Sequence, residues 1–298
     1  MGLSQSENRT LFEDRTVQDF REECCLVENA TVAAAAVFQR WSEVELELNG
    51  TTNREAPSVI LCLDCSYSAV KIALNRYCQR LCGMRIETIH VPFASDSIND
   101  KGSFEEFKSQ LYRNMQLQLD KHRPKYIVLD HITSQPALKL PIAEMVSICR
   151  NCESVVEIAV DASHAIGNLI YSEKDPTPIE IDADYYWTNI HKWAFAPHSV
   201  CALHTRKLLH HPIVSWDAGK PRGIVDEIWT GTRDYSSMLV VPHAMDYLDE
   251  VDASGMGARR NRDRVWEEGE ALAKAWGTPW PVQPLETASG MVMVMVRI

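Results

Sequence analysis

The stretch VVEIAVDASHAIG, residues 155 to 167, decides the fold. Its first half is a nearly continuous apolar run rich in β-branched residues, which is the pattern of a strand buried on both faces of a sheet. The run stops at Asp161, and His164 follows three residues later. We therefore expect a buried strand over residues 155 to 161 whose carboxyl end carries polar groups.

Similar short apolar runs occur four more times along the chain, at residues 24 to 27, 58 to 63, 126 to 130 and 183 to 188. Segments of helical period lie between them, at residues 31 to 41, 69 to 82, 103 to 122 and 142 to 152. This alternation predicts an α/β fold, a mostly parallel sheet with helices on both faces. Sheets of that kind bind ligands at the carboxyl ends of their strands.

The 298 residues, of which 45% are hydrophobic, are enough for one large domain, or for one domain and part of another. We expect a leader at residues 1 to 23 and a large ligand-binding domain at residues 24 to 250.

The charge and hydropathy of the chain exclude several classes of partner. A formal net charge of −11 argues against a nucleic-acid surface, because phosphate backbones require clustered lysines and arginines. No run approaches the roughly 18 apolar residues that cross a bilayer, and the start MGLSQSENRT lacks the apolar core of a signal peptide. We expect a cytoplasmic protein without a transmembrane segment. Gly2 and Ser6 match the short myristoylation pattern, which is frequent by chance, so that modification stays open.

Two C-x-x-C motifs among the nine cysteines raise the question of a metal site. Cys62 and Cys65 flank a strand end, whereas Cys149 and Cys152 lie in a segment of helical period, far away along the chain. Neither motif has the glycines of a zinc-ribbon knuckle. We interpret these cysteines as buried or half-buried free thiols and predict no metal.

Polar side chains follow all five expected strands. They include Asn29 and Thr31, Asp64 and Tyr67, the group Asp130, Thr133 and Ser134, the pair Asp161 and His164, and finally Asn189, His191 and Lys192. Each alone has a structural explanation, since Asn and Thr cap helices, Asp closes turns and histidines pack in cores. Gathered at one edge of a sheet, they describe a ligand site better than a set of unrelated caps.

The residue types at this edge fit pyridoxal phosphate. A helix that begins at Ala30 and Thr31 offers free N–H groups to a phosphate. Asp161 can hold a protonated ring nitrogen, and Tyr67 can cover one face of a ring. Lys192, in TNIHKWAFAP at residues 188 to 197, can form a Schiff base with the aldehyde. A reactive lysine with an aspartate partner is the pairing that this cofactor requires.

With these residues in place, the chain resembles the class V, fold-type I pyridoxal-phosphate enzymes, and among them the L-cysteine desulfhydrases and isopenicillin N epimerase-like proteins. The matching stretches follow one another from about residue 24 to the C-terminus: LVENATVAAAAV, ILCLDCSYSAVKIALN, YIVLDHITSQPALKLPI, VDASHAIGNL, DADYYWTNIHKW, HHPIVSW and WTGTRDYSSMLVVPHAMDYL. The resemblance implies that residues 24 to 250 form the large domain that binds pyridoxal phosphate. It also implies that residues 251 to 298 form a connecting helix and the beginning of a truncated smaller domain, with MVMVMV at 291 to 296 as its first strand.

The resemblance also implies a role for each residue of the edge. Lys192 attaches the cofactor, Asp161 pairs with the ring nitrogen, and Tyr67 stacks on the ring. The residues near the ring hydroxyl are His164, Thr133 and Ser134. The residues that hold the phosphate are Ala30, Thr31, Asn189 and His191, together with Gly231 and Thr232 of the partner subunit. A shared site of this kind implies a homodimer.

The reaction implied by the resemblance is C–S bond cleavage of L-cysteine or a related β-substituted amino acid, which yields sulfide or a thiol, pyruvate and ammonia. Persulfide transfer fits less well, because Cys201 lies in the apolar run SVCALH rather than in a mobile loop. Two alternatives stay open: an amino-acid epimerase of the isopenicillin N epimerase type, and a truncated non-catalytic partner of a full-length relative. The substrate-binding arginine of the family is assigned to neither Arg233 nor Arg297.

Overall fold

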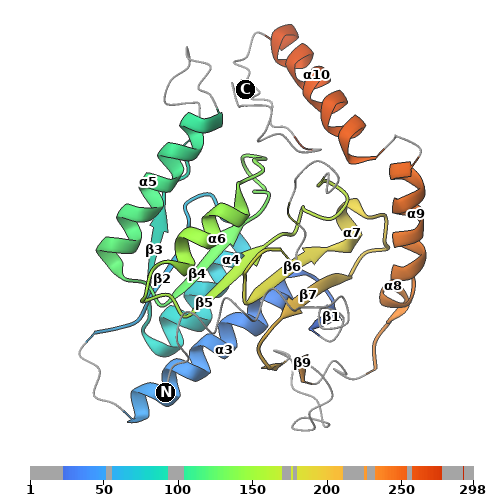
Figure 1. Ribbon diagram of the computed structural model, residues 1–298. Helices are drawn as coiled ribbons and strands as arrows, with labels where there is room; N and C mark the ends of the chain where they lie inside the picture. Colours follow the sequence, from blue (N-terminus) through green and yellow to red (C-terminus); the bar gives the residue numbers. More distant parts are fainter. Residues whose placement is uncertain are drawn as a thin grey trace.

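The computed structural model describes residues 23–51, 56–92, 104–169, 176, 180–210, 225–226, 232–253, 257–276 and 291. Seven strands form one sheet in the order β1-β7-β6-β5-β4-β2-β3 (Figure 1). They are β1 (Cys24–Val27), β2 (Val59–Leu63), β3 (Arg85–Ile89), β4 (Tyr126–Asp130), β5 (Glu157–Asp161), β6 (Tyr185–Asn189) and β7 (Cys201–Thr205). A separate short pair consists of β8 (Leu209–His210) and β9 (Val225–Asp226).

Most neighbours in the large sheet are parallel. The pairs β3 with β2, β2 with β4, β4 with β5, and β5 with β6 run in parallel, whereas β7 is antiparallel to both β6 and β1. The expected α/β fold with a mostly parallel sheet is therefore confirmed. The carboxyl ends of β2, β4, β5 and β6 consequently lie along one edge of the sheet.

Helices connect β2 to β3, β3 to β4 and β4 to β5, since a tight turn cannot join successive strands that run in parallel. The helices are α3 (Ala30–Thr51), α4 (Ser68–Leu74), the π-helix η1 (Asn75–Arg80), α5 (Phe104–His122), α6 (Ile142–Arg150), α7 (Ile190–Trp193), α8 (Ser236–Leu239), α9 (Val241–Ala253) and α10 (Ala258–Trp276). Within the described residues, no helix combines the length and apolar character that crossing a bilayer requires.

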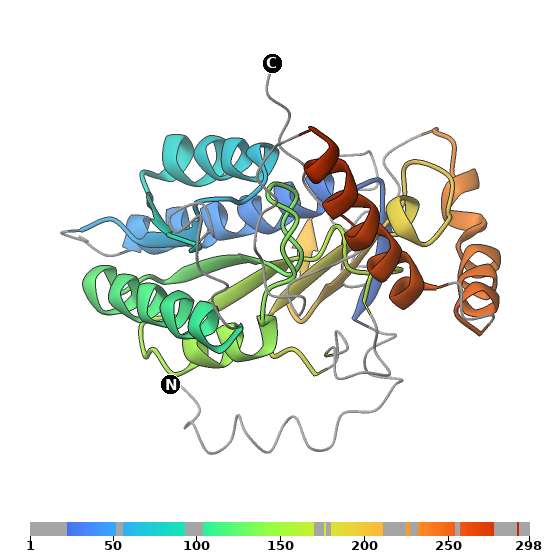
Figure 2. The same cartoon turned by 90° about the horizontal axis from the view of Figure 1, so that it is seen from above.

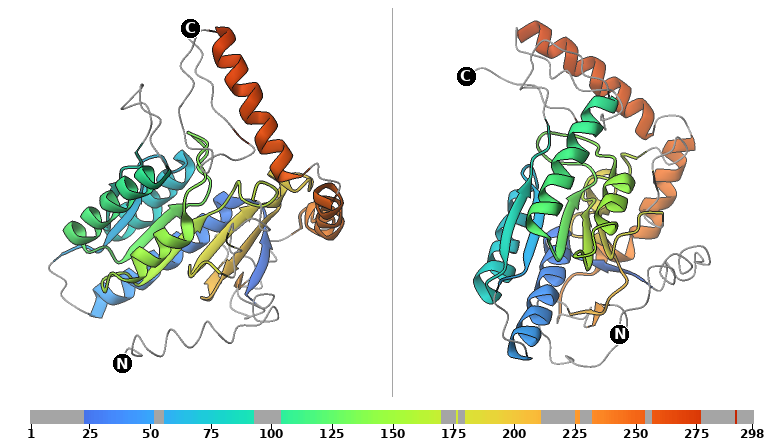
Figure 3. Two further views of the ribbon diagram at one scale, coloured as in Figure 1. Left: turned by 45° about the horizontal axis from the view of Figure 1, so that its top comes forward. Right: turned by 60° about the vertical axis from the view of Figure 1, so that its left-hand side comes forward.

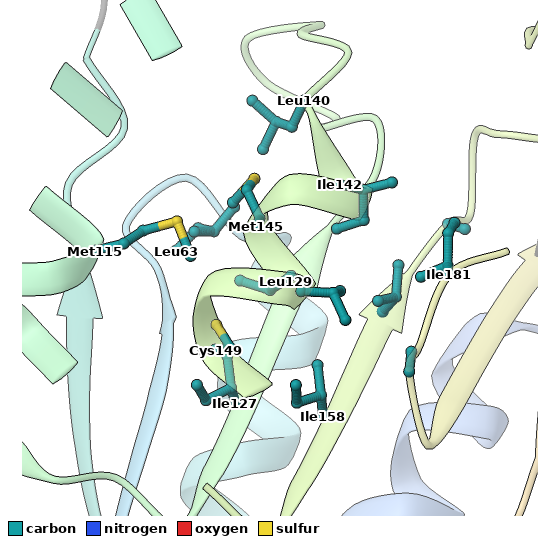
Figure 4. Packing of buried hydrophobic residues seen from close by; sticks show 14 of the residues in the cluster. Leu63, Met115, Ile127, Leu129, Leu140, Ile142, Met145, Cys149, Ile158 and Ile181 are labelled. Carbon is teal, nitrogen blue, oxygen red and sulfur yellow. The ribbon is translucent and has the colours of Figure 1, made fainter. Parts of the chain in front are cut away.

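Two helical layers cover the sheet, α3 and α4 on one face and α5 and α6 on the other (Figure 2). Successive residues of a strand point to opposite faces, so each central strand contributes to both layers. On β2, Ile60 belongs to the apolar cluster under α3, while its neighbour Leu61 belongs to the cluster under α5 and α6. Figure 4 shows the second cluster, in which Met115 and Met145 pack with strand residues such as Leu129.

Small side chains bring α3 close to the sheet. Ala33, Ala34 and Ala36 are almost completely buried, as are Phe38 and Trp41 further along the same helix. The alanines hold the start of the helix near the strands without leaving a gap. The start of α3 is thereby fixed at the edge where the polar residues gather.

The sequence patterns located five strands and missed two others of the large sheet. The strand β3, with the sequence RIETI, is a partly exposed edge strand that alternates polar and apolar residues, and the strand β7, CALHT, is short and contains a buried histidine. The helix expected over residues 69 to 82 instead changes to a π-helix at Asn75.

The domain division expected from the sequence stays a prediction. The expected boundary at residue 250 falls inside α9, and α10 occupies the position of the expected connecting helix. Figure 3 shows α10 outside the two helical layers. The expected leader apart from Glu23, and the run MVMVMV apart from Met291, lie outside the described residues.

All nine cysteines are free thiols. In the two C-x-x-C motifs, Cys62 and Cys149 are buried and Cys65 and Cys152 are half-buried. Burial raises the pKa of the Cys62 and Cys149 thiols to about 12 each. These thiols are therefore almost entirely protonated at neutral pH, and the thiolate is the reactive form.

Candidate functional site

Lys192 lies on a single turn of helix at the end of β6. The strand ends at Asn189, and the chain continues directly into α7. Ile190 and Ala194 are buried and pack in a small apolar cluster with Ala244 of α9, so they anchor the turn. Lys192 itself remains exposed, which leaves its amine accessible to a ligand.

His164 faces that amine from the loop after β5. Its Nε2 atom lies 3.0 Å from Lys192 Nζ, and its Nδ1 atom accepts a hydrogen bond of 3.1 Å from the indole Nε1 of Trp193. The loop lies tight against α7, because Gly167 has φ +78° and a Cβ atom there would stand 2.2 Å from the Trp193 carbonyl oxygen. Glycine is the residue that allows this approach.

Asp161 is the buried carboxylate of the site. Its Oδ1 atom accepts hydrogen bonds from the backbone N–H of Ser163, at 2.9 Å, and from the Ser163 hydroxyl. Burial raises the pKa of Asp161, while the bonds from Ser163 and the positive charge of Lys192 oppose that rise. The carboxylate is thus positioned by its own loop and lies within electrostatic reach of the lysine.

Asp130 is the direct partner of Asp161 in the sheet, since β4 and β5 pair these two residues in register. It is buried and accepts a hydrogen bond from the Ser66 hydroxyl. Burial and repulsion from Asp161 raise the pKa of Asp130 to about 8. Two adjacent buried carboxylates do not both ionise, so the pair carries a single negative charge near neutral pH.

The two basic groups of the site are tuned toward their neutral forms. Partial desolvation lowers the pKa of Lys192, against the attraction of Asp161 and Cys201. Burial and the neighbouring Lys192 lower the pKa of His164 to about 4. The imidazole is therefore neutral at pH 7, and the lysine loses its proton more readily than an ordinary lysine does. The neutral amine is the nucleophilic form.

The start of α3 is joined to the strand that carries Lys192. Asn189 Oδ1 accepts a hydrogen bond of 2.9 Å from the N–H of Ala30, although the two residues are 159 positions apart. Asn29 caps the helix, since its Oδ1 accepts a bond of 3.0 Å from the N–H of Val32. Thr31 is exposed on the same turn. The helix start and the lysine thus belong to one local assembly.

Two further predicted residues are bonded to their own surroundings. His191 Nδ1 lies 2.7 Å from the carbonyl oxygen of Val200. Thr133 is buried, and its hydroxyl donates to the Pro136 carbonyl and accepts from the N–H of Leu138. The Thr133 hydroxyl therefore shapes the loop after β4.

The remaining predicted residues lie at the surface. Ser134 is half-buried in the loop after β4, Tyr67 precedes α4 with 52% of its surface exposed, and Thr232 is exposed. In the part of the chain that the structure describes, no hydrogen bond links Tyr67, Ser134 or Thr232 to Lys192. Their roles at the cofactor stay predictions.

Three residues predicted from the sequence lie together in the structure. Lys192 contacts His164, and Asp161 lies within electrostatic reach of the lysine. The sequence patterns assigned no role to Trp193 or to Ser66. Trp193 directly follows the lysine, and this position was the available signal. The Ser66 bond to Asp130 depends on how the loop after β2 meets the end of β4.

Comparison with known proteins gives clear sequence relatives. The L-cysteine desulfhydrase of Arabidopsis thaliana is 35% identical over 293 residues, which cover 96% of this chain and 61% of that protein. Three more proteins from rice and Arabidopsis with L-cysteine desulfhydrase in their names are 34 to 38% identical, and the chain covers 54 to 59% of them. The chain therefore spans little more than half the length of these relatives. No family model matches it.

Solved structures share the fold at low sequence identity. A cysteine desulfurase from Thermococcus onnurineus superposes with a TM-score of 0.65 at 15% identity, covering 97% of this chain and 68% of that one. The cystine C-S lyase C-DES, in a variant with glycine covalently linked to its pyridoxal-phosphate cofactor, has a TM-score of 0.56 at 16% identity, covering 92% and 69%. These likenesses establish the architecture.

Proposed function

We propose that the chain, which is 34 to 38% identical to plant proteins named L-cysteine desulfhydrase, is a pyridoxal-phosphate-dependent lyase for the C–S bond of L-cysteine or a related β-substituted amino acid. From L-cysteine and water the products are hydrogen sulfide, pyruvate and ammonia. The observation that carries the proposal is the accessible Lys192 amine, 3.0 Å from His164 and within electrostatic reach of the buried Asp161. The chain spans 54 to 61% of the length of these relatives, so we propose their activity for it on the strength of this partial match.

The donor set at this edge fits the cofactor. Lys192 offers an amine of lowered pKa for attachment to an aldehyde, and Asp161 offers a buried carboxylate for the ring nitrogen. The first turn of α3 has no acidic residue, so the positive end of its dipole suits a phosphate, although the N–H groups of Ala30 and Val32 are already bonded to Asn189 and Asn29. The other residues that would hold the cofactor are His164, Thr133 and Ser134 at the ring hydroxyl, Tyr67 at the ring face, and Ala30, Thr31, Asn189 and His191 at the phosphate. When bound, the cofactor supplies an electron sink for the carbanion at Cα of the substrate.

Lys192, Asp161 and His164 have different roles in the proposed reaction. Lys192 Nζ is the base for the Cα proton, because its lowered pKa increases the fraction of free amine at neutral pH. The buried pair of Asp161 and Asp130 holds one negative charge for the ring nitrogen, because burial raises the pKa of both carboxyl groups and the two do not ionise together. His164 is neutral and holds the amine in place through Nε2.

Release of sulfide and pyruvate from L-cysteine tests this function. We expect the purified protein with added pyridoxal phosphate to form the two products in equal amounts. Lys192→Ala should reduce the rate by roughly 10²- to 10⁴-fold, because it removes the positioned base. Lys121→Ala, at an exposed position near the end of α5, is the matched control and should keep the wild-type rate.

Two outcomes of the same assay point elsewhere. Deuterium incorporation at Cα with recovery of the D-amino acid and no sulfide would assign the site to an epimerase. No turnover by folded protein that binds the cofactor would contradict the lyase proposal and favour a non-catalytic partner of a longer relative.

The proposal includes a homodimer in which Thr232 of the partner subunit completes the phosphate site. In support, Thr232 is exposed and thus available to a neighbouring subunit. Mixing Lys192→Ala with Thr232→Ala tests the arrangement, because a hybrid dimer regains one intact site when the two residues act across subunits. Activity that stays at the level of the separate variants would contradict a shared site.

The cytoplasm is the proposed location, and the nine free thiols support a reducing compartment. One Arabidopsis relative is named as chloroplastic, and the chloroplast is therefore the competing location. Fractionation of cells that express the chain distinguishes the two.

A further inference from the structure

We propose that Trp193 is a positioning residue, whose indole N–H fixes the tautomer of His164 so that the ring Nε2–H donates to the Lys192 amine and holds it in its unprotonated form. The inference rests on the proposed function for its catalytic meaning and adds to it a residue that prepares the lysine for the cofactor.

The tautomer follows from the two contacts of one imidazole ring. An indole nitrogen donates and never accepts, so the contact of 3.1 Å from Trp193 Nε1 requires Nδ1 of His164 to carry no proton. The neutral ring then carries its proton on Nε2. That N–H points at Lys192 Nζ, 3.0 Å away.

The protonation state of the lysine follows from the tautomer. An ammonium group has donors only, so it would place its N–H groups against the Nε2–H of His164. A neutral amine accepts the same bond through its lone pair. The Trp193–His164 pair therefore favours the free amine, which is the form that attacks an aldehyde.

The other groups around Lys192 do not favour the free amine by charge. Asp161 on β5 and Cys201 on β7 attract the ammonium form, while partial desolvation opposes it. His191, the preceding residue, is bonded through Nδ1 to the backbone of Val200. The His164 ring, which Trp193 orients, is the neighbour that selects the neutral amine by hydrogen bonding.

The surrounding backbone keeps the ring in this orientation. The side-chain amide of Asn168 donates to the carbonyl of His164 at 2.9 Å, and the N–H of Ile166 donates to the Thr188 hydroxyl at 3.3 Å. Gly167 lies against the Trp193 backbone at the same place. Two contacts thus fasten the histidine loop to the lysine segment, Ile166 to Thr188 and Gly167 to Trp193, while the Asn168 bond braces the histidine loop from within.

Nitrogen NMR of the cofactor-free protein tests the tautomer directly. In protein labelled with ¹⁵N-histidine, two-bond ¹H–¹⁵N spectra distinguish Nε2–H from Nδ1–H rings, and His164→Gln assigns one of the ten histidines by its disappearance. We expect the Nε2–H form for His164 in the wild type and a mixture or the Nδ1–H form in Trp193→Phe. Trp276→Phe is the matched control, at a tryptophan with 54% of its surface exposed.

Capture of pyridoxal phosphate by Lys192 gives the second readout. We expect the capture rate of Trp193→Phe near pH 7.5 to fall roughly tenfold, the factor that corresponds to one unit of pKa, with its pH midpoint moved upward. Trp276→Phe should capture at the wild-type rate.

The outcomes separate this inference from the proposed function. An Nδ1–H ring or an imidazolium in the wild type overturns the inference, even if Trp193→Phe fails to fold. An Nε2–H ring that persists in Trp193→Phe also overturns it. A wild type with the Nε2–H ring, slowed capture in Trp193→Phe and no sulfide from L-cysteine would refute the lyase function and leave the inference standing.

Discussion

At the scale of single residues, the buried pair Asp130 and Asp161 links the stability of the cofactor-free protein to pH. The pKa of Asp130 is about 8 in the folded protein and roughly 4 in an unfolded chain. Between these values the folded state holds a proton that the unfolded state has lost. Stability contributed by Asp130 is therefore complete below about pH 4 and is lost as the pH rises through about 8.

We predict that the free energy of unfolding falls between pH 6.5 and 8, with a slope of up to about 1.4 kcal/mol per pH unit from this proton. The window begins at the ordinary pKa of histidine, about 6.5, so His164 opposes the slope at the lower end and contributes little above about pH 7.5. Asp130→Asn keeps an acceptor for Ser66 and should remove the slope. Urea unfolding at several pH values measures it, with Asp249→Asn at an exposed position as the control. A slope that is unchanged in Asp130→Asn would contradict the assignment.

The sequence could indicate Lys192, Asp161 and His164 because parallel strands deliver the residues at their carboxyl ends to one edge. To predict that these residues lie at one edge, only the positions of the strands along the chain were needed. The contacts of Trp193 and Ser66 could not be predicted in this way, since they depend on the paths of loops and on side-chain rotamers. Thr133 shows the same limit, because its hydroxyl is bonded inside its own loop.

At the scale of elements, the loop after β5 and the turn α7 behave as one unit. Gly167 allows their backbones to meet, with a positive φ and no side chain at the contact. His164 and Trp193 come from the two sides of this contact and bond to each other. A substitution at Gly167 therefore displaces the turn that carries Lys192, although Gly167 does not contact the lysine side chain.

We predict that Gly167→Ala destabilises the protein by about 3 kcal/mol, the sum of a left-handed backbone penalty and overpacking against the Trp193 carbonyl. Gly83→Ala is the matched control, since Gly83 has φ +73° but nothing within 4 Å of an added Cβ, and it should cost about 1 kcal/mol. Thermal unfolding compares the two variants. Equal losses would show that the close approach to Trp193 is not a constraint.

Four of the five predicted strands have the simplest burial, whereas the fifth, β1, is a half-buried edge strand, and β7 was missed although it is almost wholly buried. Strands β2, β4, β5 and β6 are buried along their whole length and read as apolar runs. Strand β3 lies at an edge of the sheet and is partly exposed, so its apolar residues alternate with polar ones. The change from α-helix to π-helix at Asn75 leaves no periodic signal in so short a segment.

At the scale of the whole molecule, one sheet serves two apolar layers. Because alternate residues of a strand face opposite layers, the two apolar clusters are built on the same strands. Loss of packing in one layer therefore destabilises strands that also pack against the other layer. We expect the described sheet and its helices to unfold as a single cooperative unit.

We predict that Ile60→Ala and Leu61→Ala, at neighbouring positions of β2, each destabilise the same transition by about 2 to 5 kcal/mol. Both side chains are fully buried, and they face opposite layers. Guanidinium unfolding followed by circular dichroism and by tryptophan fluorescence should give coincident curves for both variants. Two separated transitions, with each variant moving only one of them, would contradict a shared core.

Two buried cysteines can report separately on local opening of the two apolar layers. Cys62 belongs to the layer of α3 and Cys149 to the layer of α5 and α6, and both thiols are held in their inert form by burial. An alkylating reagent can consume either one only during the moments when its layer opens to water. The alkylation rates of Cys62 and Cys149, measured in one sample under native conditions, would therefore report how often each layer opens. Equal changes in the two rates across conditions would show that the layers open together.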